Sequence, residues 1–321
     1  MTSQPLVAVV VLNWNKAPDT AYCVQALLGQ GHGDLRVIVV DNGSEHGSLG
    51  PIEALPPSVL LLRNDRNLGF AGGVNVGVTR AVGDGADYVW LMNNDAIPNP
   101  DALARCLAAM AADPGVGLVS PVILNADAGD EVEFCGGTWN GVAFQTTADL
   151  ALSREWHEHS PDRAWLVGTA LLIDRRVVEA IGFFDEDLFA YWEDNDYCVR
   201  AIRAGFRCAV ARDAVVRHWS GRPKTHPGLK PLHYHYYMAR NELLFLRKTL
   251  ARRDRPRPLL WAIDRQFRKI GQLQAYPDAT DAILGGLWDG IRGRGGPYRR
   301  DRHVGGPAAS ILRGLVRVMG R

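Results

Sequence analysis

The stretch DYVWLMNNDAIPNP, residues 87–100, joins an apolar run to an abrupt polar end. Residues 88–92 are apolar or aromatic, and Asn93, Asn94 and Asp95 follow them directly. A continuous apolar run of this length is typical of a strand buried on both faces, and the two prolines that follow the polar residues mark its end. The three polar side chains need hydrogen bonds or a cation, so this strand is expected to end in a binding site.

Runs of the same kind recur through the N-terminal third of the chain. Helical patterns, among them one near 71–82, separate four apolar runs, at 6–12, 35–41, 58–64 and 87–93. This alternation predicts an α/β fold with a mainly parallel central sheet that helices cover on both faces. In such sheets ligands bind beyond the carboxyl ends of the strands.

Polar residues gather at three of these predicted strand ends. The first run ends in Asn13 and Trp14, the second in Asp41, and the fourth in Asn94 and Asp95. Turn chemistry alone favours Asn and Asp in loops, so each residue taken singly is also explained as a turn residue. Their occurrence at three strand ends together indicates a functional site.

The composition is that of a soluble globular protein, with 47% hydrophobic and 22% charged residues among 321. The N-terminus has no basic region or cleavage site, and no apolar run approaches the length of a membrane span. The five cysteines are odd in number and lack a CxxC pair. They predict reduced thiols in a cytoplasmic protein and argue against a zinc site.

The second half of the chain changes pattern near residue 228. FAYWEDNDYCVRAIRAGF (189–206) predicts a helix that ends at Gly205, and RCAVARDAVVRHWSG (207–221) predicts two further short strands. Helical periodicity dominates from about residue 230. We therefore expect a ligand-binding catalytic domain over 1–228 and a mainly helical, basic region over 229–321.

The charge of the chain is unevenly distributed. Residues 251–321 contain 15 Arg and Lys and 6 Asp, a net charge of +9, although the whole chain carries only +1. The segment ILRGLVRVMGR (311–321) is basic and amphipathic enough for peripheral contact with the inner face of a membrane, but a solvated helix or a homo-oligomer contact explains it equally well. Aromatic and basic residues are not interleaved, which argues against nucleic acid as a partner.

Two common phosphate-binding signatures are absent. NWNKAPDT (13–20) stands where a dinucleotide-binding fold needs its glycines, and no Walker motif occurs. GFAGGVNVG (69–77) is expected to open a helix whose backbone can approach a phosphate closely.

The chain resembles the family 2 glycosyltransferases, in particular their bacterial rhamnosyltransferase-like and galactofuranosyltransferase-like members. The resemblance covers about residues 6–245 and rests on six motifs in order: VVVLNWN, VIVVDNGS, RNLGFAGGVNVG, WLMNNDAIPNP, GFFDEDLFAYWEDNDYCVRAIRAGF and VRHWSG. It implies a GT-A fold with a C-terminal helical extension. It also implies an inverting, metal-dependent transfer of a sugar, which includes deoxysugars such as rhamnose, from a UDP- or dTDP-sugar to a hydroxyl acceptor in glycan, polysaccharide or natural-product biosynthesis.

The resemblance implies roles for the residues at the strand ends. Trp14 would stack on the nucleotide base, and Asp41 would accept a hydrogen bond from the base N3–H. Asn94 would lie beside the ribose. The nucleotide-sugar site would also include Asn13, Asn67 and Gly69.

A divalent cation, Mn²⁺ or Mg²⁺, is implied by the same resemblance. Most relatives have two aspartates in the fourth strand-end motif, whereas Asn93-Asn94-Asp95 keeps only the last carboxylate. By position Asp95 and His218 would be the protein ligands, and the donor diphosphate would supply the other oxygens. An imidazole among oxygen ligands suits Mn²⁺ better than Mg²⁺.

The acidic helix start YWEDNDY is where the resemblance places the general base. Asp194, the second member of the Glu-Asp pair, would take the acceptor proton, and Glu193 is the runner-up. Asp and Glu are also favoured at helix starts for capping, so a purely structural role remains open. The sugar or acceptor site would further include Gly168, Thr169 and Trp192.

Two other classes of function remain open at this level. A sugar-phosphate nucleotidyltransferase shares the alternating architecture but needs a glycine- and arginine-rich first loop, which LNWNKAP (12–18) does not provide. A nucleotide-sugar binding protein without turnover would show the same base pocket. A processive polysaccharide synthase is excluded because its membrane helices and Gln-x-x-Arg-Trp motif are missing.

Overall fold

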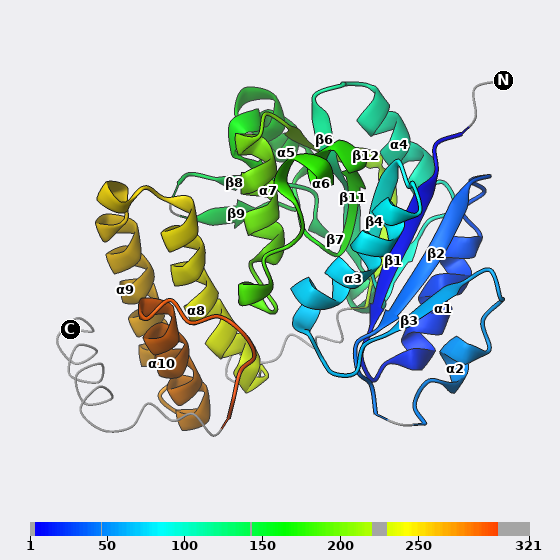
Figure 1. Ribbon diagram of the computed structural model, residues 1–321. Helices are drawn as coiled ribbons and strands as arrows, with labels where there is room; N and C mark the ends of the chain where they lie inside the picture. Colours follow the sequence, from blue (N-terminus) through cyan, green and yellow to red (C-terminus); the bar gives the residue numbers. More distant parts are fainter. Residues whose placement is uncertain (1–3, 46, 142, 220–229, 301–321) are drawn as a thin grey trace. The chain divides into compact units, whose positions relative to one another are not determined.

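The computed structural model describes residues 4–300 except 46, 142 and 220–229 (Figure 1). Its centre is a mixed sheet of nine strands, in the order β3-β2-β1-β4-β11-β6-β12-β5, with β7 paired to β6. The strands are β1 (Val7–Asn13), β2 (Leu35–Asp41), β3 (Leu60–Arg63), β4 (Tyr88–Asn93), β5 (Ala96–Pro98), β6 (Val116–Asn125), β7 (Glu131–Phe134), β11 (Ala170–Asp174) and β12 (Arg207–His218).

The four strands predicted from apolar runs form the parallel half of this sheet. Val9 pairs in register with Val37 of β2 and with Trp90 of β4, and all three side chains are buried. Continuous apolar sequence is needed here because both faces of the sheet are covered by helices. The predicted α/β architecture with a mainly parallel sheet is therefore confirmed.

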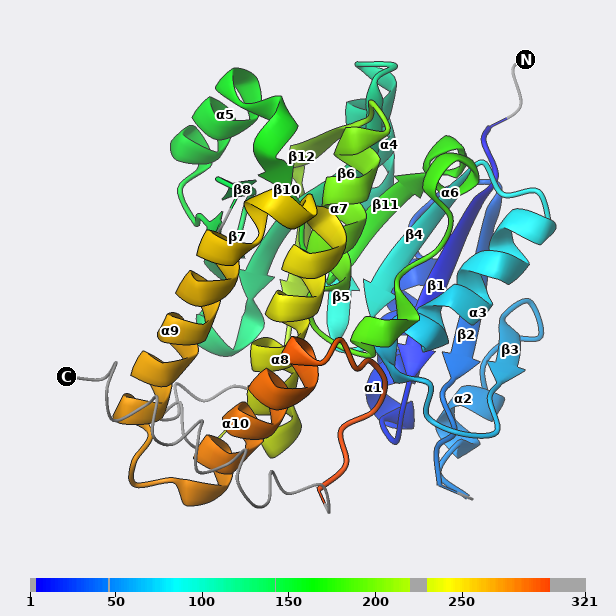
Figure 2. The ribbon, with the colours of Figure 1, turned by 60° about the vertical axis from the view of Figure 1, so that its left-hand side comes forward.

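Helices of the same unit connect these strands. Helices α1 and α3 lie on opposite faces of the sheet (Figures 1 and 2). The helices are α1 (Ala17–Leu28), α2 (Gly50–Glu53), α3 (Gly69–Gly83), α4 (Ala102–Ala111), α5 (Leu150–His159) and α6 (Arg175–Ile181). Helix α7 (Glu193–Arg203) begins in the second compact unit and continues in this one. A small second sheet, in the order β10-β8-β9, contains β8 (Gly137–Trp139), β9 (Phe144–Thr146) and β10 (Ala164–Trp165).

The sequence RCAVARDAVVRHWSG contains one long strand, so the prediction of two short strands is wrong. Strand β12 runs in parallel beside β6, and its register shifts between Ala211 and Val215. Polar residues at the irregularity interrupt the apolar run, which explains why the sequence suggests two strands. The continuous strand carries His218 to the end of the sheet, where it pairs with Ala96 of β5.

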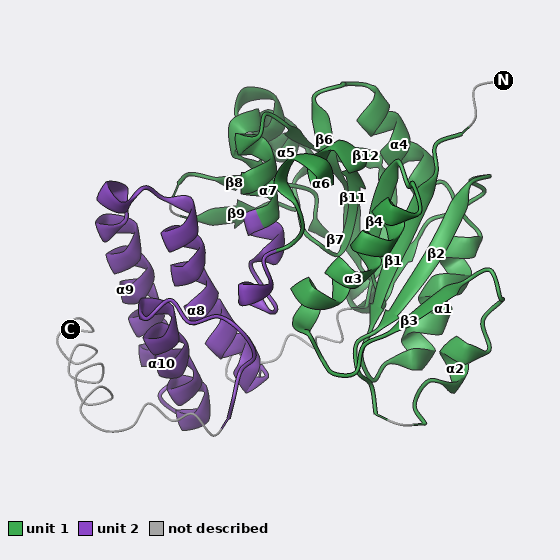
Figure 3. Ribbon diagram, in the orientation of Figure 1, with its two compact units in different colours: residues 1–184, 197–222 green, residues 185–196, 223–321 purple. Residues whose placement is uncertain are grey.

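The chain divides into two compact units, residues 1–184 with 197–222 and residues 185–196 with 223–321 (Figure 3). The second unit contains helices α8 (Leu232–Thr249), α9 (Pro256–Gln272) and α10 (Pro277–Ile291). The boundary predicted near residue 228 and the amphipathic segment 311–321 lie outside the described residues. Among the described helices, none is long and apolar enough to cross a membrane.

Glycines allow helix α3 to approach the sheet closely. A Cβ atom on Gly77 would lie 2.4 Å from Cγ1 of Val10 and 3.1 Å from Cγ2 of Val40. Both valines are buried in adjacent strands and are 1% and 0% exposed. The glycine-rich sequence that opens α3 is therefore required for packing, besides any contact with a ligand.

We predict that Gly77→Ala lowers the stability of the protein by about 1–3 kcal/mol, because the added methyl group overpacks the contact between helix and sheet. Gly83→Ala, in the last turn of the same helix, is the matched control because its Cβ would meet no atom within 4 Å. Urea unfolding of both variants would measure the difference. Equal stability of the two variants would contradict this packing.

Candidate active site

The ends of strands β1 and β2 are joined by a buried hydrogen bond between Asn13 and Asp41. These residues are partners in the parallel register, and they are 0% and 3% exposed. Asn13 Nδ2 donates to Asp41 Oδ1 at 2.8 Å and to Ser44 Oγ at 3.1 Å. Ser44 Oγ in turn donates to Asp41 Oδ1, and the Ser44 amide donates to Oδ2 at 3.3 Å. The orientation of the Asp41 carboxylate is thus fixed before any ligand binds.

Trp14 follows this pair directly and is 51% exposed. It is therefore not a core aromatic, and its ring is available to a ligand. The next residue, Asn15, has a left-handed backbone with φ 55°, and its amide donates to Ser44 Oγ at 2.8 Å. The same serine that orients Asp41 therefore fixes the turn that presents Trp14.

A second polar network surrounds the start of helix α3. Buried Asn42 donates through Nδ2 to the Gly69 carbonyl at 2.9 Å and to Asn67 Oδ1 at 3.1 Å. Asn67 Oδ1 also accepts the Gly69 amide at 2.8 Å, and Gly69 has φ 79°. An open hollow of about 390 Å³ lies beside this network and is lined by Arg63, Asn64, Asp65, Arg66 and Leu68.

Asn94 is linked to the end of β1 through Thr20 on helix α1. Asn94 Nδ2 donates to Thr20 Oγ1 at 3.0 Å, and Thr20 Oγ1 lies 2.8 Å from Asn13 Oδ1. Three predicted site positions, Asn13, Asp41 and Asn94, therefore belong to one connected network. The strand ends are brought together as expected for a parallel sheet.

Asp95 and His218 meet although 122 positions separate them in the sequence. Strand β5 begins immediately after Asp95 and pairs with the end of β12, so that Ala96 is the partner of His218. His218 Nε2 lies 3.2 Å from Asp95 Oδ1, and His218 Nδ1 lies 3.1 Å from Glu133 Oε2. The imidazole is thus held between two carboxylates, of which one was predicted and the other was not.

The protonation of His218 reflects both its burial and these carboxylates. Burial lowers the pKa of His218, but hydrogen bonds to Asp95 and Glu133 and their negative charges raise it to about 9. Without a cation, the imidazole is therefore protonated at neutral pH. A metal ion at Nε2 would replace that proton.

The donor atoms of Asp95 and His218 fit a divalent metal ion. Two ligand atoms at right angles around an ion with bonds of about 2.1 Å lie about 3 Å apart, close to the distance between Oδ1 and Nε2. A carboxylate behind the imidazole, here Glu133 at Nδ1, is the usual partner of a metal-binding histidine. Among the described residues no group of three His, Cys, Asp or Glu side chains could hold a metal. Oxygen atoms of water or of a substrate could supply further ligands.

Glu193 and Asp194 begin helix α7 and belong to the second unit. Glu193 is 8% exposed, and its Oε2 is buried and has no hydrogen-bond partner among the described residues. Burial raises the pKa of Glu193, and the charge of Asp194 raises it further. Asp194 is half-buried, and its Oδ1 accepts the Asn195 amide at 2.8 Å. The surroundings of Glu193 therefore favour its protonated form.

The segment before α7 has an unusual backbone. Phe189, Tyr191 and Trp192 have φ values of 63°, 67° and 76°. For side chains other than glycine such conformations cost roughly 1–3 kcal/mol each and occur where surrounding contacts enforce them. The predicted acceptor-site residue Trp192 is 9% exposed and packs on Phe245 at 5.5 Å between ring centroids. Its ring is therefore part of the core of the second unit.

Gly168 and Thr169 immediately precede strand β11. Thr169 is 7% exposed, and its carbonyl accepts the Asn93 amide at 2.9 Å. This bond joins the predicted sugar-site segment to the end of β4 in the first unit. The two residues therefore lie next to the Asn93-Asn94-Asp95 sequence.

The sequence does not reveal three polar residues of this site, Thr20, Ser44 and Glu133. Thr20 and Ser44 bridge predicted residues from a helix and a turn, where Ser and Thr are common for local reasons. Glu133 lies on β7, in a part of the chain that shows only loop-like composition. A negative charge in a short strand is the only local signal, and it is a weak one.

The fold is shared with glycosyltransferases of known structure. The mannosyltransferase PcManGT from Pyrobaculum calidifontis, solved with GDP-Man and Mn²⁺, matches with a TM-score of 0.56 and 21% identity over 100% of this chain and 82% of that chain. TarS 1-349 of S. aureus, solved with UDP-GlcNAc, matches with a TM-score of 0.60 and 17% identity over 98% of this chain and 87% of that chain. The predicted GT-A fold is confirmed.

The chain belongs to the family described as "Glycosyltransferase like family 2", whose family model matches residues 4–230. A galactofuranosyltransferase, GlfT1 of Mycolicibacterium smegmatis, is 26% identical over 71% of this chain and 75% of its own length. The N-acetylglucosaminyl-diphospho-decaprenol L-rhamnosyltransferase of Mycobacterium tuberculosis is 27% identical over 65% of this chain and 75% of its own length. The resemblance seen in the motifs is confirmed, and the protein is a sugar transferase of glycan biosynthesis.

We predict that Glu193→Gln alters the pH dependence of stability. The pKa of Glu193 is raised in the folded state, so between the pKa of the unfolded chain and that of the folded protein only the folded protein keeps the proton. The stability of the wild type therefore falls as the pH rises between these two pKa values. The amide of the variant cannot ionise, so Tm of the variant relative to wild type should increase from about pH 5 to about pH 9. Thermal melts of the exposed Glu155→Gln variant provide the control, and a constant difference for Glu193→Gln would contradict the prediction.

Proposed function

We propose that this family 2 glycosyltransferase moves a sugar from a UDP- or dTDP-sugar to a hydroxyl acceptor, with inversion at the transferred carbon and with a divalent cation. The observation that carries the proposal is the distance of 3.2 Å between Asp95 Oδ1 and His218 Nε2. These two donors lie beside the connected network of strand ends, where a nucleotide diphosphate would bind. The solved relatives with a nucleotide sugar or Mn²⁺ support the assignment.

The donor base would bind at the ends of β1 and β2. Asp41 accepts hydrogen bonds from Asn13 and Ser44, which hold its carboxylate in place for a base N–H. Trp14 offers a half-exposed ring for stacking. Uracil and thymine, the bases of UDP and dTDP, present an N3–H donor that this carboxylate could accept.

Asp95 and His218 would hold Mn²⁺ or Mg²⁺ against the donor diphosphate. When bound, the cation would stabilise the negative charge that develops on the leaving diphosphate. With a cation bound, Glu133 would keep the proton on Nδ1 of His218 and leave the lone pair of Nε2 for the metal. Asn94 would lie beside the ribose, and its hydrogen bond to Thr20 fixes its position. A site with so few protein ligands would bind the cation weakly unless a diphosphate is present.

Asp194 would act as the general base that takes the proton from the acceptor hydroxyl. A direct displacement with inversion needs one carboxylate on the acceptor side and no covalent intermediate. Asp194 lies in the first turn of α7, where the helix dipole favours the ionised form. Glu193, buried and with a raised pKa, is better suited to donate a hydrogen bond than to accept a proton.

We predict that Asp194→Asn lowers kcat by about 10²- to 10⁴-fold, because the amide cannot accept the proton. The Kd for the donor nucleotide, measured by isothermal titration, should change by less than about twofold, since base and diphosphate contact other residues. Release of nucleotide from a panel of UDP- and dTDP-sugars would measure turnover.

Glu193→Gln is the matched comparison, because it removes the neighbouring carboxylate from the same helix turn. Its kcat should stay well above that of Asp194→Asn. If Glu193→Gln lost all turnover and Asp194→Asn turned over normally, Glu193 and not Asp194 would be the general base. A wild-type protein that binds nucleotide sugars and releases no nucleotide with any acceptor would instead support a binding protein without turnover.

A further inference from the structure

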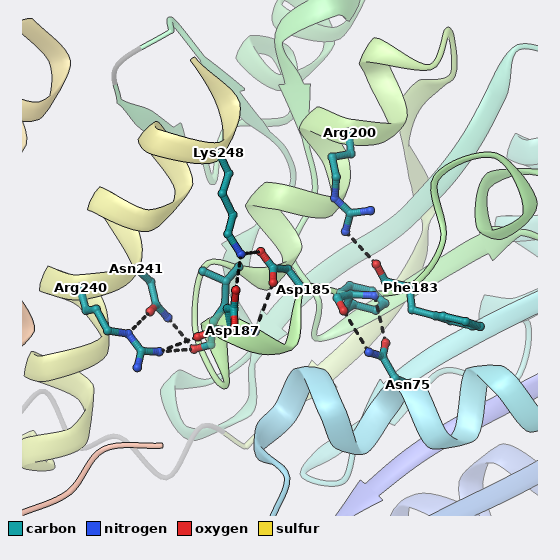
Figure 4. Close-up of polar contacts among 10 residues, drawn as sticks. Asn75, Phe183, Asp185, Asp187, Arg200, Arg240, Asn241 and Lys248 are labelled. Atoms are coloured by element: carbon teal, nitrogen blue, oxygen red, sulfur yellow. Dashed lines mark hydrogen bonds and ion pairs between the residues drawn. The ribbon is translucent and has the colours of Figure 1, made fainter. Parts of the chain in front are cut away.

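The backbone of residues 185–192, called the loop before α7 below, is held by side chains of helix α8 (Figure 4). Both belong to the second unit. The three left-handed residues Phe189, Tyr191 and Trp192 end this loop, and none of them is glycine. Aromatic side chains disfavour this conformation, so the loop needs contacts that select it.

Asn241 supplies the closest set of such contacts. Its Nδ2 lies within hydrogen-bond distance of three carbonyls, which share its two hydrogens: Leu188 at 2.8 Å, Ala190 at 2.8 Å and Tyr191 at 2.7 Å. Its Oδ1 accepts a hydrogen bond from Nε of Arg240 at 2.8 Å, which sets the orientation of the amide. The side chain is fully buried, so water cannot replace these bonds.

Arg240 and Lys248 hold the beginning of the same loop. Nη2 of Arg240 donates to the carbonyls of Asp187 at 3.1 Å and Leu188 at 2.9 Å. The guanidinium is fully buried and lies over the rings of Tyr236 and Tyr237. Nζ of Lys248 contacts the carboxylates of Asp185 and Asp187 (Figure 4).

The residues directly before the loop are fixed in the first unit. Asn75 of helix α3 exchanges two hydrogen bonds with the backbone of Phe184, at 2.9 and 3.0 Å. Arg200 donates to the carbonyls of Ile181 and Phe183, both at 2.9 Å. The chain therefore enters the loop from an anchored position (Figure 4).

The end of the loop starts helix α7. The Trp192 carbonyl accepts the Asp196 amide at 2.9 Å, which is the first helical hydrogen bond and spans Glu193 and Asp194. A change in the backbone at Tyr191 or Trp192 would therefore tilt the first turn of α7. Because side-chain position in a catalytic site must hold to within about 1 Å, such a tilt would move a base out of reach.

We propose that Asn241 and Arg240 are positioning residues for catalysis: they hold the loop before α7 in its left-handed conformation and so fix the place of the Asp194 carboxylate. The proposal rests on the assignment of Asp194 as the base. It predicts that helix α8 affects the chemical step while leaving donor binding unchanged, since the residues proposed for the nucleotide and the cation belong to the first unit.

The test is Asn241→Leu, which nearly keeps the volume of the side chain and removes the donor of all three carbonyl contacts. We expect kcat to fall by about 100-fold, with KM for the donor changed by less than about twofold. Leu243→Ala is the matched control, because Leu243 is buried on the same helix and packs against Gly290 of α10. That variant should lose stability, yet its kcat should remain within about threefold of wild type. Equal kcat in Asn241→Leu and Leu243→Ala would overturn the proposal.

Two further measurements keep the outcome decisive. Hydrogen exchange of amides 189–196 should quicken in Asn241→Leu and stay unchanged in Leu243→Ala, whichever residue is the base; unchanged exchange in Asn241→Leu would overturn the proposal. Normal turnover of Asp194→Asn, together with faster exchange in Asn241→Leu, would refute the base and retain the hold of α8 on the loop. If Asn241→Leu does not fold, Lys248→Met is the substitute test, because it removes the contacts of helix α8 with Asp185 and Asp187 of the loop. A kcat lowered roughly three- to tenfold supports the proposal, and an unchanged kcat overturns it.

Discussion

The pairing of the three-residue strand β5 with the end of β12 is the constraint on which the site depends. It makes Ala96 the partner of His218 and thereby sets Asp95 beside the imidazole. The Trp219 amide extends the ladder by donating to the Asp95 carbonyl at 2.8 Å. A single carboxylate at the end of β4 would be a poor cation site. The Asp95 carboxylate and the imidazole of His218, at the end of β12, together offer two donor atoms at a separation that suits a cation.

The parallel half of the sheet could be predicted from the sequence because its signals are local. Continuous apolar runs identify β1, β2 and β4, and polar residues such as Asp41 and Asp95 mark where they end. Parallel strands bring those ends to one edge, so their meeting follows from the topology. The position of Glu133 could not be derived in this way. It depends on long-range strand pairing, and a side chain in a short strand has no periodicity that points to a distant partner.

The Glu-Asp pair shows a different limit of sequence reasoning. Sequence alone does not distinguish two adjacent carboxylates at a helix start, and only the resemblance favours Asp194 as the general base. The fold separates them by burial, because successive residues of a helix point in directions about 100° apart. Glu193 faces the interior and keeps a proton more readily, whereas Asp194 stays half-buried. The left-handed backbone at Phe189, Tyr191 and Trp192 precedes this helix start, and none of these residue types predicts such a conformation.

We propose that the protein and the donor diphosphate together complete one cation site. The most direct measurement is the affinity for Mn²⁺, determined by electron paramagnetic resonance of the free ion with and without UDP. Asp95 and His218 alone supply two donors, so we expect weak binding that becomes roughly 10- to 100-fold tighter with UDP and loses this gain in Asp95→Asn. An affinity for Mn²⁺ that is the same with and without UDP would contradict the account.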